Sequence, residues 1–394
     1  MDDASGIGMT AAARARLIGA GYAAQGLGYA AVVTALPAFK DRQGIDDTFV
    51  SAILLLVCVA AAGGSMLADR IATRWGSRYA LASGLLLVSA GLAGATVATP
   101  NAVFAAVLLA YGVGLGAVDA SLSMQGVLVQ ARLGRSVMSR LFAAYTAAAI
   151  AAALLMSGVL ESGAGAELAI GVAAGFAALI GMIGWRAFEP GRTLRAAAAH
   201  PHGSRALRPI VLACGMLIFT AFLVDSAVST WSSVYLQDSL GAASSVAPLG
   251  YAAYQAAVLV SRLVADHVMP RAGRLVVAVG GLAVCGIGCG LVALLPSVGA
   301  AVTGFAISGI GVGVLVPLAF SAAGESAAES SDEVIAKVNL FNYGGALVGA
   351  VLIGALSEPV GLRIAFLIPV VAVILTLPLA RRLPHLALAT PSLK

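Results

Sequence analysis

The sequence has few charged residues for its length. Only 10% of its 394 residues are Asp, Glu, Lys or Arg, whereas a soluble globular protein carries about a quarter. Hydrophobic residues make up 60% of the chain, and the mean hydropathy is +0.98. Because so few charges cannot cover a water-exposed surface, we expect lipid to surround most of the chain.

Motifs for catalysis and metal binding are also scarce. No Gly-rich loop ends in the Lys-Ser/Thr pair that holds nucleotide phosphates, and no nucleophile clusters with a base, so we expect no ATP hydrolysis and no enzyme activity. Cys285 and Cys289, one helical turn apart, have no accompanying histidine, which favours packing over a metal site. The four histidines fall in predicted loops or the tail: His200, His202, His267 and His385. We therefore expect no cofactor and no metal.

The sequence instead contains long apolar runs, typical of membrane-spanning helices of about 20 residues. Twelve such helices are predicted, over residues 15–39, 49–68, 79–99, 102–128, 137–160, 166–187, 209–236, 246–265, 275–296, 298–322, 336–357 and 362–380. The first follows Asp2 and Asp3 and has no small-residue cleavage site after it, which favours a retained helix over a signal peptide. We expect an all-α membrane protein.

Basic residues gather in alternate loops. When the N-terminus is placed inside, only Lys40, Arg42 and Arg363 of the 23 Lys and Arg residues lie outside, which leaves 20 on the inner side. Because inner loops carry the excess of Lys and Arg, this placement predicts a membrane protein with both termini in the cytoplasm. The charges are spread over every inner loop, which argues against nucleic acid as a partner.

The chain repeats itself halfway along. Each half contains an Asp with an Arg five residues later and a Gly seven residues later: Asp69, Arg74 and Gly76, then Asp266, Arg271 and Gly273. The copies are 197 residues apart, which is half of 394. A glycine triplet recurs at the same offset, as Gly112, Gly114 and Gly116, then Gly309, Gly311 and Gly313. We predict two pseudo-symmetric six-helix halves, over 1–185 and 209–394, joined by a cytoplasmic linker at 186–208.

The repeated charged turns are predicted to act as a cytoplasmic gate. An Asp at the inner membrane edge can accept hydrogen bonds from a neighbouring helix N-terminus or pair with a nearby Arg, and so latch the two halves in one state. The alternative, that these residues only set topology, explains the arginines but not the repeated Asp and Gly. The predicted gate comprises Asp69, Arg70, Arg74, Gly76, Arg78, Asp266, Arg271 and Gly273.

Two acidic residues, Asp119 and Asp225, interrupt the predicted spans far from their ends. A rise of about 1.5 Å per residue places Asp225 in the outer half of the membrane and Asp119 in the inner half. Removal from water favours the neutral form of a carboxyl group, so each Asp could take a proton from one side and release it to the other. The alternative is a protonated Asp that only joins two helices.

Polar and aromatic side chains on the predicted helices are candidates for binding a solute. Gln25 could instead make a hydrogen bond between helices, and Trp231 could anchor the outer membrane interface. No Lys or Arg is predicted well inside a span, so a small, polar, organic solute that is neutral or cationic is favoured. The candidates are Gln25, Tyr29, Gln125, Tyr145, Trp231, Tyr254, Gln255, Asn339 and Asn342.

These features together resemble the major facilitator superfamily. The resemblance rests on twelve helices in two halves, a basic central linker, and the turn from Asp69 to Arg78, which is repeated after the eighth helix. The stretches 36–42 and 231–240 and the run from Asp119 to Gly126 resemble its YbjJ-like branch. The fourth helix lacks the Arg and the fifth the Gly-Pro pair typical of the superfamily's multidrug antiporters, which argues against export of that kind.

The resemblance implies a monomeric secondary transporter of the bacterial inner membrane that works by alternating access. We expect it to move a small organic solute, coupled to protons through Asp225 and Asp119, with the direction of transport undecided. Two alternatives stay open: multidrug or metabolite efflux by proton antiport, and a membrane receptor or scaffold that moves nothing.

Overall fold

The computed structural model describes residues 10–97, 99–134, 137–190, 208–325 and 331–380. In the first half, the helices are α1 (Ala11–Thr34), α2 (Leu36–Gln43), α3 (Asp47–Trp75), α4 (Ser77–Ala95), α5 (Asn101–Leu133), α6 (Met138–Glu161) and α7 (Ala166–Ala187). In the second half, they are α8 (Arg208–Val234), η2 (Tyr235–Ser239), α9 (Ala247–Ala272), α10 (Arg274–Leu294), α11 (Val298–Glu325), α12 (Ser331–Leu347), η3 (Val348–Leu352), α13 (Ile353–Val360), α14 (Leu362–Ala365) and α15 (Leu367–Ala380). The all-helical membrane fold is confirmed for the described residues.

The helix boundaries have local causes. The Asp46 carboxylate accepts a hydrogen bond from Phe49 N at 2.7 Å and caps α3. Gly76 and Gly273, the glycines of the two repeated turns, both have positive φ, at 107° and 80°, and each separates two helices. The repeat in the sequence therefore marks an equivalent break in each half.

Ten of the described helical stretches are long and apolar enough to cross a membrane. The two other long helices that we predicted as spans, α1 and α9, carry more polar groups, such as Arg16 and Gln25 in α1 and Arg262 in α9, which lower their hydropathy. The boundaries predicted from sequence miss the break at Ala35 between α1 and α2, where Pro37 begins a new helix. They also miss the π-helical turns η2 and η3.

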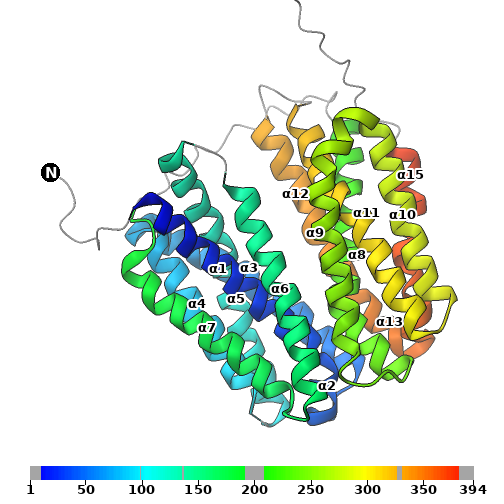
Figure 1. The fold of residues 1–394 in the computed structure, drawn as a ribbon, viewed down its shortest axis with the longest axis horizontal. Helices are drawn as coiled ribbons and strands as arrows, with labels where there is room; N and C mark the ends of the chain where they lie inside the picture. Colours follow the sequence, from blue (N-terminus) through cyan, green and yellow to red (C-terminus); the bar gives the residue numbers. More distant parts are fainter. Residues whose placement is uncertain (1–9, 98, 135–136, 191–207, 326–330, 381–394) are drawn as a thin grey trace, which may run out of the picture.

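The helices form two groups, α1–α7 and α8–α15 (Figure 1). The groups approach each other at the end that carries α2 and α13 and spread apart toward the opposite end. Following the predicted topology, we call the α2 end the outer end and the opposite end the inner end. The linker predicted at 186–208 falls mostly on residues 191–207, outside the described residues, so the proposed domain boundaries stay a prediction.

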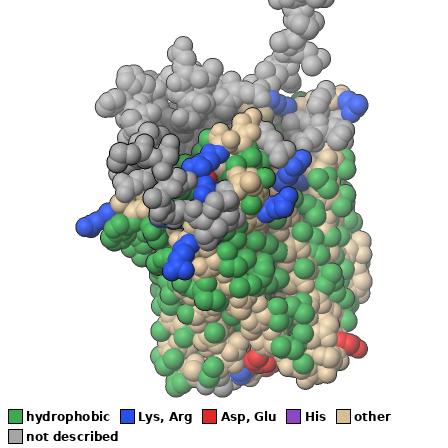
Figure 2. Space-filling model, turned by 60° about the vertical axis from the view of Figure 1, so that its left-hand side comes forward, with side chains coloured by type: hydrophobic (Ala, Val, Ile, Leu, Met, Phe, Trp, Pro, Cys, Tyr) green, Lys and Arg blue, Asp and Glu red, His purple; other side chains and the backbone are tan. Residues whose placement is uncertain are grey.

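The surface fits a membrane environment. On the face in Figure 2, hydrophobic side chains cover the flank, Lys and Arg side chains gather toward one end, and acidic side chains lie near the other. Large side chains exposed on the flank include Val59, Leu263 and Leu375, which are 61–63% exposed. A soluble protein would cover such a surface with polar groups, so these side chains face lipid.

The repeated glycine triplets let the helices of each half pack closely. A Cβ on Gly112 or Gly116 would overlap α3, whereas one on Gly114 would overlap α4. In the second half, Gly309 and Gly313 face α9 in the same way, and Gly311 faces α10. Glycines two residues apart point to opposite neighbours, so each triplet serves two helix contacts at once.

Neighbouring glycines of α3 provide a test of this packing. Gly64 lies against the backbone of Val113 in α5, where a Cβ would overlap the carbonyl oxygen, whereas a Cβ on Gly63 would have nothing within 4 Å. We expect Gly64→Ala to destabilise the protein by about 1–3 kcal/mol through overpacking, and Gly63→Ala to be neutral or slightly stabilising. Thermal unfolding of the two purified variants measures the difference. Equal melting temperatures would contradict the packing described for α3 and α5.

Candidate functional site

Asp119 forms a polar pair with Gln25 between α5 and α1. Gln25 Nε2 donates a hydrogen bond to Asp119 Oδ1 at 3.1 Å, so the structure brings these two predicted residues together. Asp119 is exposed, and one turn further along α5 Ser123 is exposed as well. The hydrogen bond between helices considered for Gln25 is present, and the carboxyl group also remains within reach of solvent.

Asp225 lies among tyrosines at the contact of the two halves. Tyr254 Oη donates a hydrogen bond to Asp225 Oδ1 at 2.8 Å, joining α9 to α8. Tyr29 of α1 and Tyr145 of α6 are close enough to Asp225 to interact with it electrostatically, as is Tyr251 of α9. We call these four tyrosines and Asp225 the tyrosine layer.

Gln255 completes this layer by donating a hydrogen bond from Nε2 to Tyr251 Oη at 2.8 Å. Tyr251 was not among the candidates from sequence. Its spacing of three and four residues from Tyr254 and Gln255 places all three on one face of α9, and this spacing could have identified it. The layer therefore draws side chains from both halves.

Glu189 is a buried acid that differs from both Asp residues in its partners. It follows α7, is 1% exposed, and forms ion pairs with Arg132 Nη2 at 2.8 Å and Arg14 Nη1 at 3.6 Å. Its backbone N donates to Gln125 Oε1 at 2.9 Å, and its carbonyl accepts from Gln125 Nε2 at 3.0 Å. Gln125 also donates to Ser77 Oγ at 2.8 Å, so in this conformation both polar atoms of its amide bind within the first half.

Trp231 is completely buried between the halves. Its Nε1 donates to the carbonyl of Ala350 in η3 at 2.9 Å, and a Cβ on Gly354 would overlap both the indole ring and Ser51 of α3. In this conformation the ring contacts neither the membrane interface nor an open site. Asn342 is partly exposed on α12, whereas the side chain of Asn339 lies outside the described residues.

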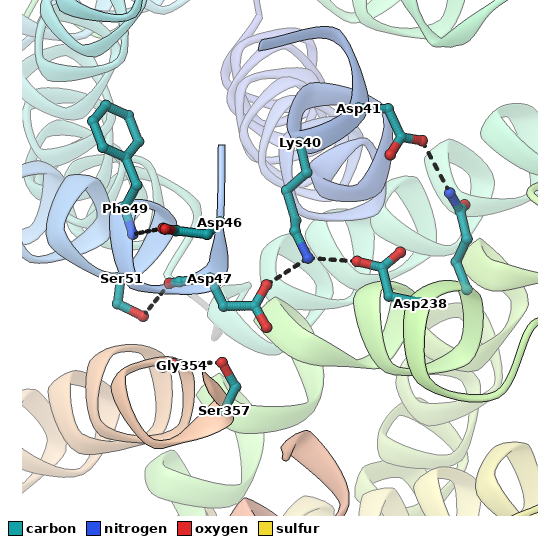
Figure 3. Close-up of polar contacts among 10 residues, drawn as sticks. Lys40, Asp41, Asp46, Asp47, Phe49, Ser51, Asp238, Gly354 and Ser357 are labelled. Carbon is teal, nitrogen blue, oxygen red and sulfur yellow. Dashed lines mark hydrogen bonds and ion pairs between the residues drawn. The ribbon is translucent and has the colours of Figure 1, made fainter. Parts of the chain in front are cut away.

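An ion-pair cluster joins the halves at the outer end (Figure 3). Lys40 of α2 binds the carboxylate of Asp238 in η2 and that of Asp47 in α3, the latter at 2.5 Å. Beside it, Gln237 Nε2 donates to Asp41 Oδ2 at 3.4 Å. We call Lys40, Asp47 and Asp238 the outer clasp. Burial disfavours the charged form of Lys40, but its hydrogen bonds to Asp238 and Asp47 outweigh burial and raise the pKa of Lys40 above its ordinary value.

A cavity of about 190 Å³ lies between the outer clasp and the tyrosine layer. We call it the chamber. Helices α1, α2, α3 and α5 line it on one side, and α8, α12 and η3 line it on the other. Tyr29 belongs both to the chamber wall and to the tyrosine layer, and Ser226, next to Asp225, is also in the wall. The tyrosine layer and the chamber therefore adjoin each other, with Tyr29 shared between them.

The profile of the Major Facilitator Superfamily matches residues 18–350. The chain belongs to the major facilitator superfamily. It is 28% identical over 348 residues to an uncharacterized MFS-type transporter of Yersinia pestis, covering 86% of this chain and 88% of the relative. It is 26% identical over 347 residues to the membrane protein MosC of Rhizobium meliloti, covering 87% and 83%.

Solved structures share the fold at low identity. The nucleoside transporter NupG has a TM-score of 0.69 at 14% identity, over 94% of this chain and 98% of that one. An inward-facing, unoccupied bacterial homolog of the human lysosomal transporter Spinster has a TM-score of 0.71 at 13% identity, over 95% and 97%. As a superfamily member, the protein is an integral membrane transporter and not an enzyme. The YbjJ-like branch stays a prediction.

Two arginines of the predicted cytoplasmic gate, Arg74 and Arg78, contact aromatic side chains next to them in the sequence. Arg74 lies over the ring of Trp75 at 5.1 Å, and Arg78 Nη2 donates to Tyr79 Oη at 2.8 Å, so both contact their own neighbours. No described side chain forms an ion pair with Asp69, and the side chain of Asp266 lies outside the described residues. The latch stays a prediction for a conformation in which the inner ends meet.

The outer clasp can be tested with two matched variants. Asp238→Asn removes the ion pair between the halves, whereas Asp47→Asn removes a carboxylate from the same Lys40 within the first half. Loss of about 1 kcal/mol, typical of a partly exposed ion pair, should increase outward opening about fivefold for Asp238→Asn only. The rate at which an impermeant cationic thiol reagent, added outside, modifies Cys58 in the chamber wall measures this opening. Equal rates in the two variants would contradict the role of the clasp.

Proposed function

We propose that this protein is a proton-coupled secondary transporter that moves a small organic solute by alternating access, with Asp225 and Asp119 as the proton-carrying groups. The observation that supports this proposal most is the contrast between the partners of Glu189 and those of Asp119 and Asp225. Glu189 is paired with two arginines, whereas Asp119 and Asp225 have neutral hydrogen-bond partners, Gln25 and Tyr254.

The type of partner decides whether an interior acid can exchange its proton. A carboxylate paired with a guanidinium stays charged, because protonation would leave the cation unpaired and buried. A neutral amide or hydroxyl stabilises the carboxylate less, and burial opposes the charge, so both protonation states remain accessible. Arg262 interacts electrostatically with Asp225, but it forms no ion pair with it within 4 Å among the described residues. This residual attraction would favour release of the proton once the carboxyl group faces the inner end.

The positions of the two acids support coupling to solute movement. Asp225 lies in the tyrosine layer, where side chains of α1, α6, α8 and α9 converge. Asp119 is solvent accessible in a structure whose halves meet at the outer end and spread at the inner end (Figure 1). A change in the charge of Asp225 would alter its contacts with both halves, which is how protonation would shift the balance between two conformations.

Solute contacts are proposed for the tyrosine layer and its neighbours. Tyr29, Tyr145, Tyr254 and Gln255 surround Asp225 with groups that donate and accept hydrogen bonds, and Asn342 is partly exposed on α12. Gln125 and Trp231 already use their polar atoms within the protein, so they are not part of this proposed site in the present conformation. The family includes transporters of organic solutes such as the nucleoside transporter NupG, which supports a small organic molecule as the solute.

Purified protein in proteoliposomes tests the proposal. Solutes that raise the melting temperature are first selected from sugars, amino acids, nucleosides and organic cations, and their flux is then driven by a pH gradient. We expect Asp225→Asn to lower the driven flux at least tenfold, because a permanently neutral side chain cannot carry a proton. Exchange of labelled for unlabelled solute should persist, because exchange needs no net proton movement.

Two outcomes distinguish coupling from loss of fold. Asp225→Glu keeps a titratable group and should recover part of the driven flux, while a protein that had merely unfolded would lose exchange as well. Driven flux that is unchanged in Asp225→Asn would remove Asp225 from the coupling role. A protein that moves none of the tested solutes under any gradient would favour the receptor or scaffold alternative.

A further inference from the structure

The chamber wall is apolar almost throughout. Aliphatic and aromatic side chains from α2 and from the outer parts of α1, α3 and α5 form most of it, among them Val33, Phe39, Ile53, Phe104 and Leu108. Among the described residues, no Lys, Arg, Asp or Glu is part of the wall. Such a surface gains free energy by excluding water and by contacting apolar groups, at about 25 cal/mol per Å².

The few polar groups of the wall carry no charge. Tyr111 is 3% exposed, lines the chamber, and its hydroxyl has no hydrogen-bond partner among the described residues. Ser226 Oγ already donates to the carbonyl of Ala346 at 2.7 Å. A buried hydroxyl without a partner costs free energy, so Tyr111 has a hydrogen bond to offer to an occupant. One charged side chain, Asp225, lies just beyond the wall and interacts electrostatically with Tyr29.

We infer that the chamber receives the apolar part of the transported solute while Asp225 receives its amine or hydroxyl end. The solute class is therefore a compact amphipathic molecule, such as a small arylalkyl amine or alcohol. This inference rests on the proposed function and narrows the polar solute expected from the sequence. It assigns the chamber as a specificity site, next to the groups that carry the proton.

The volume sets the size of the apolar part. An engineered cavity of about 150 Å³ binds benzene, and pockets for drug-sized ligands measure about 300–1,000 Å³. A chamber of about 190 Å³ therefore holds one six-membered ring with a short chain. Larger fused ring systems would need the halves to move apart.

The same wall excludes other solutes. A sugar would bury several hydroxyl groups against aliphatic side chains, and each hydroxyl left without a partner costs free energy. A carboxylate would meet no cation in the wall and would be repelled by a charged Asp225. An amine gains from that same charge, and an alcohol can bind Tyr111 or Asp225 by hydrogen bonds.

Cys58 provides a reporter for occupancy. It lines the chamber and is exposed, whereas Cys214, Cys285 and Cys289 are buried. The purified full-length protein is treated with N-ethylmaleimide, and alkylation is followed by intact mass, with Cys58→Ala to identify the fast-reacting thiol. Four probes are compared: phenethylamine, phenethyl alcohol, ethanolamine, which lacks the ring, and phenylacetate, which carries the opposite charge.

We expect saturating phenethylamine and phenethyl alcohol to slow alkylation of Cys58 at least fivefold, with no slowing by ethanolamine or phenylacetate. Leu54→Trp, which fills the chamber, should abolish the slowing, whereas Leu56→Trp should not, because Leu56 lies outside the wall on the same helix and is 47% exposed. Asp225→Asn should weaken the effect of the amine and leave that of the alcohol, which separates the two ends of the probe.

The probe comparison on the unmodified protein is decisive by itself, so it does not depend on how well Leu54→Trp folds. Equal effects of ethanolamine and phenethylamine, slowing by phenylacetate, or no slowing by phenethylamine would each overturn the inference. The proposed function is tested separately. Proton-driven flux of a sugar in proteoliposomes, without any effect of the aryl probes on Cys58, would overturn the chamber assignment and leave proton coupling standing.

Discussion

A carboxyl group removed from water must either be paired with a cation or be able to give up its charge, and the interior of this transporter depends on that constraint. Glu189 meets it by pairing with Arg14 and Arg132, which ties the inner ends of α1 and α5 to the end of α7. Asp225 meets it with a neutral donor, Tyr254, whereas Asp119, which is exposed in this conformation, has the neutral donor Gln25. One arrangement makes a fixed joint within a half, and the other leaves a group that can change its charge.

The contact between the halves is ordered from the outer end inward. The outer clasp joins α2 and α3 to η2, the apolar chamber follows, and the tyrosine layer with Asp225 lies beyond it. The Gln25–Asp119 pair comes next, one turn inward of the chamber residue Leu115 on α5. In the described part of the chain, charges thus lie at the two ends of the chamber and none in its wall, so an apolar group can enter it without separating an ion pair.

Much of the fold could be predicted from sequence because its causes are local or repeated. Apolar runs fix the spans, and the glycine triplets at 112–116 and 309–313 mark equivalent close contacts in both halves. Asp119 and Asp225 stood out because an acid inside an apolar run is rare. The partner of each acid could not be predicted, because helix pairing brings together residues such as Gln25 and Asp119 that are 94 apart.

The site residues were harder to assign because one side-chain chemistry serves several roles. The amide of Gln125 can bind a solute or a backbone, and only the structure shows it bound to Glu189 and Ser77. Lys40 was counted only as a residue outside the membrane, since its partner Asp238 lies 198 residues away. The chamber is formed by apolar side chains of both halves. Each of these side chains is typical of a membrane-spanning helix, so no sequence pattern predicts the chamber.

The central claim is that the two halves pivot about this ordered contact, and paired distance measurements test it most directly. Spin labels in a Cys58→Ala background would replace the exposed residues Ser162 and Ser244 near the outer end, and Thr73 and Leu340 near the inner end. Electron–electron distances are then recorded in lipid across a pH series. We expect the outer pair to gain a longer distance as the inner pair gains a shorter one, with the same pH midpoint. Distances that stay fixed, or that lengthen together at both ends, would contradict the account.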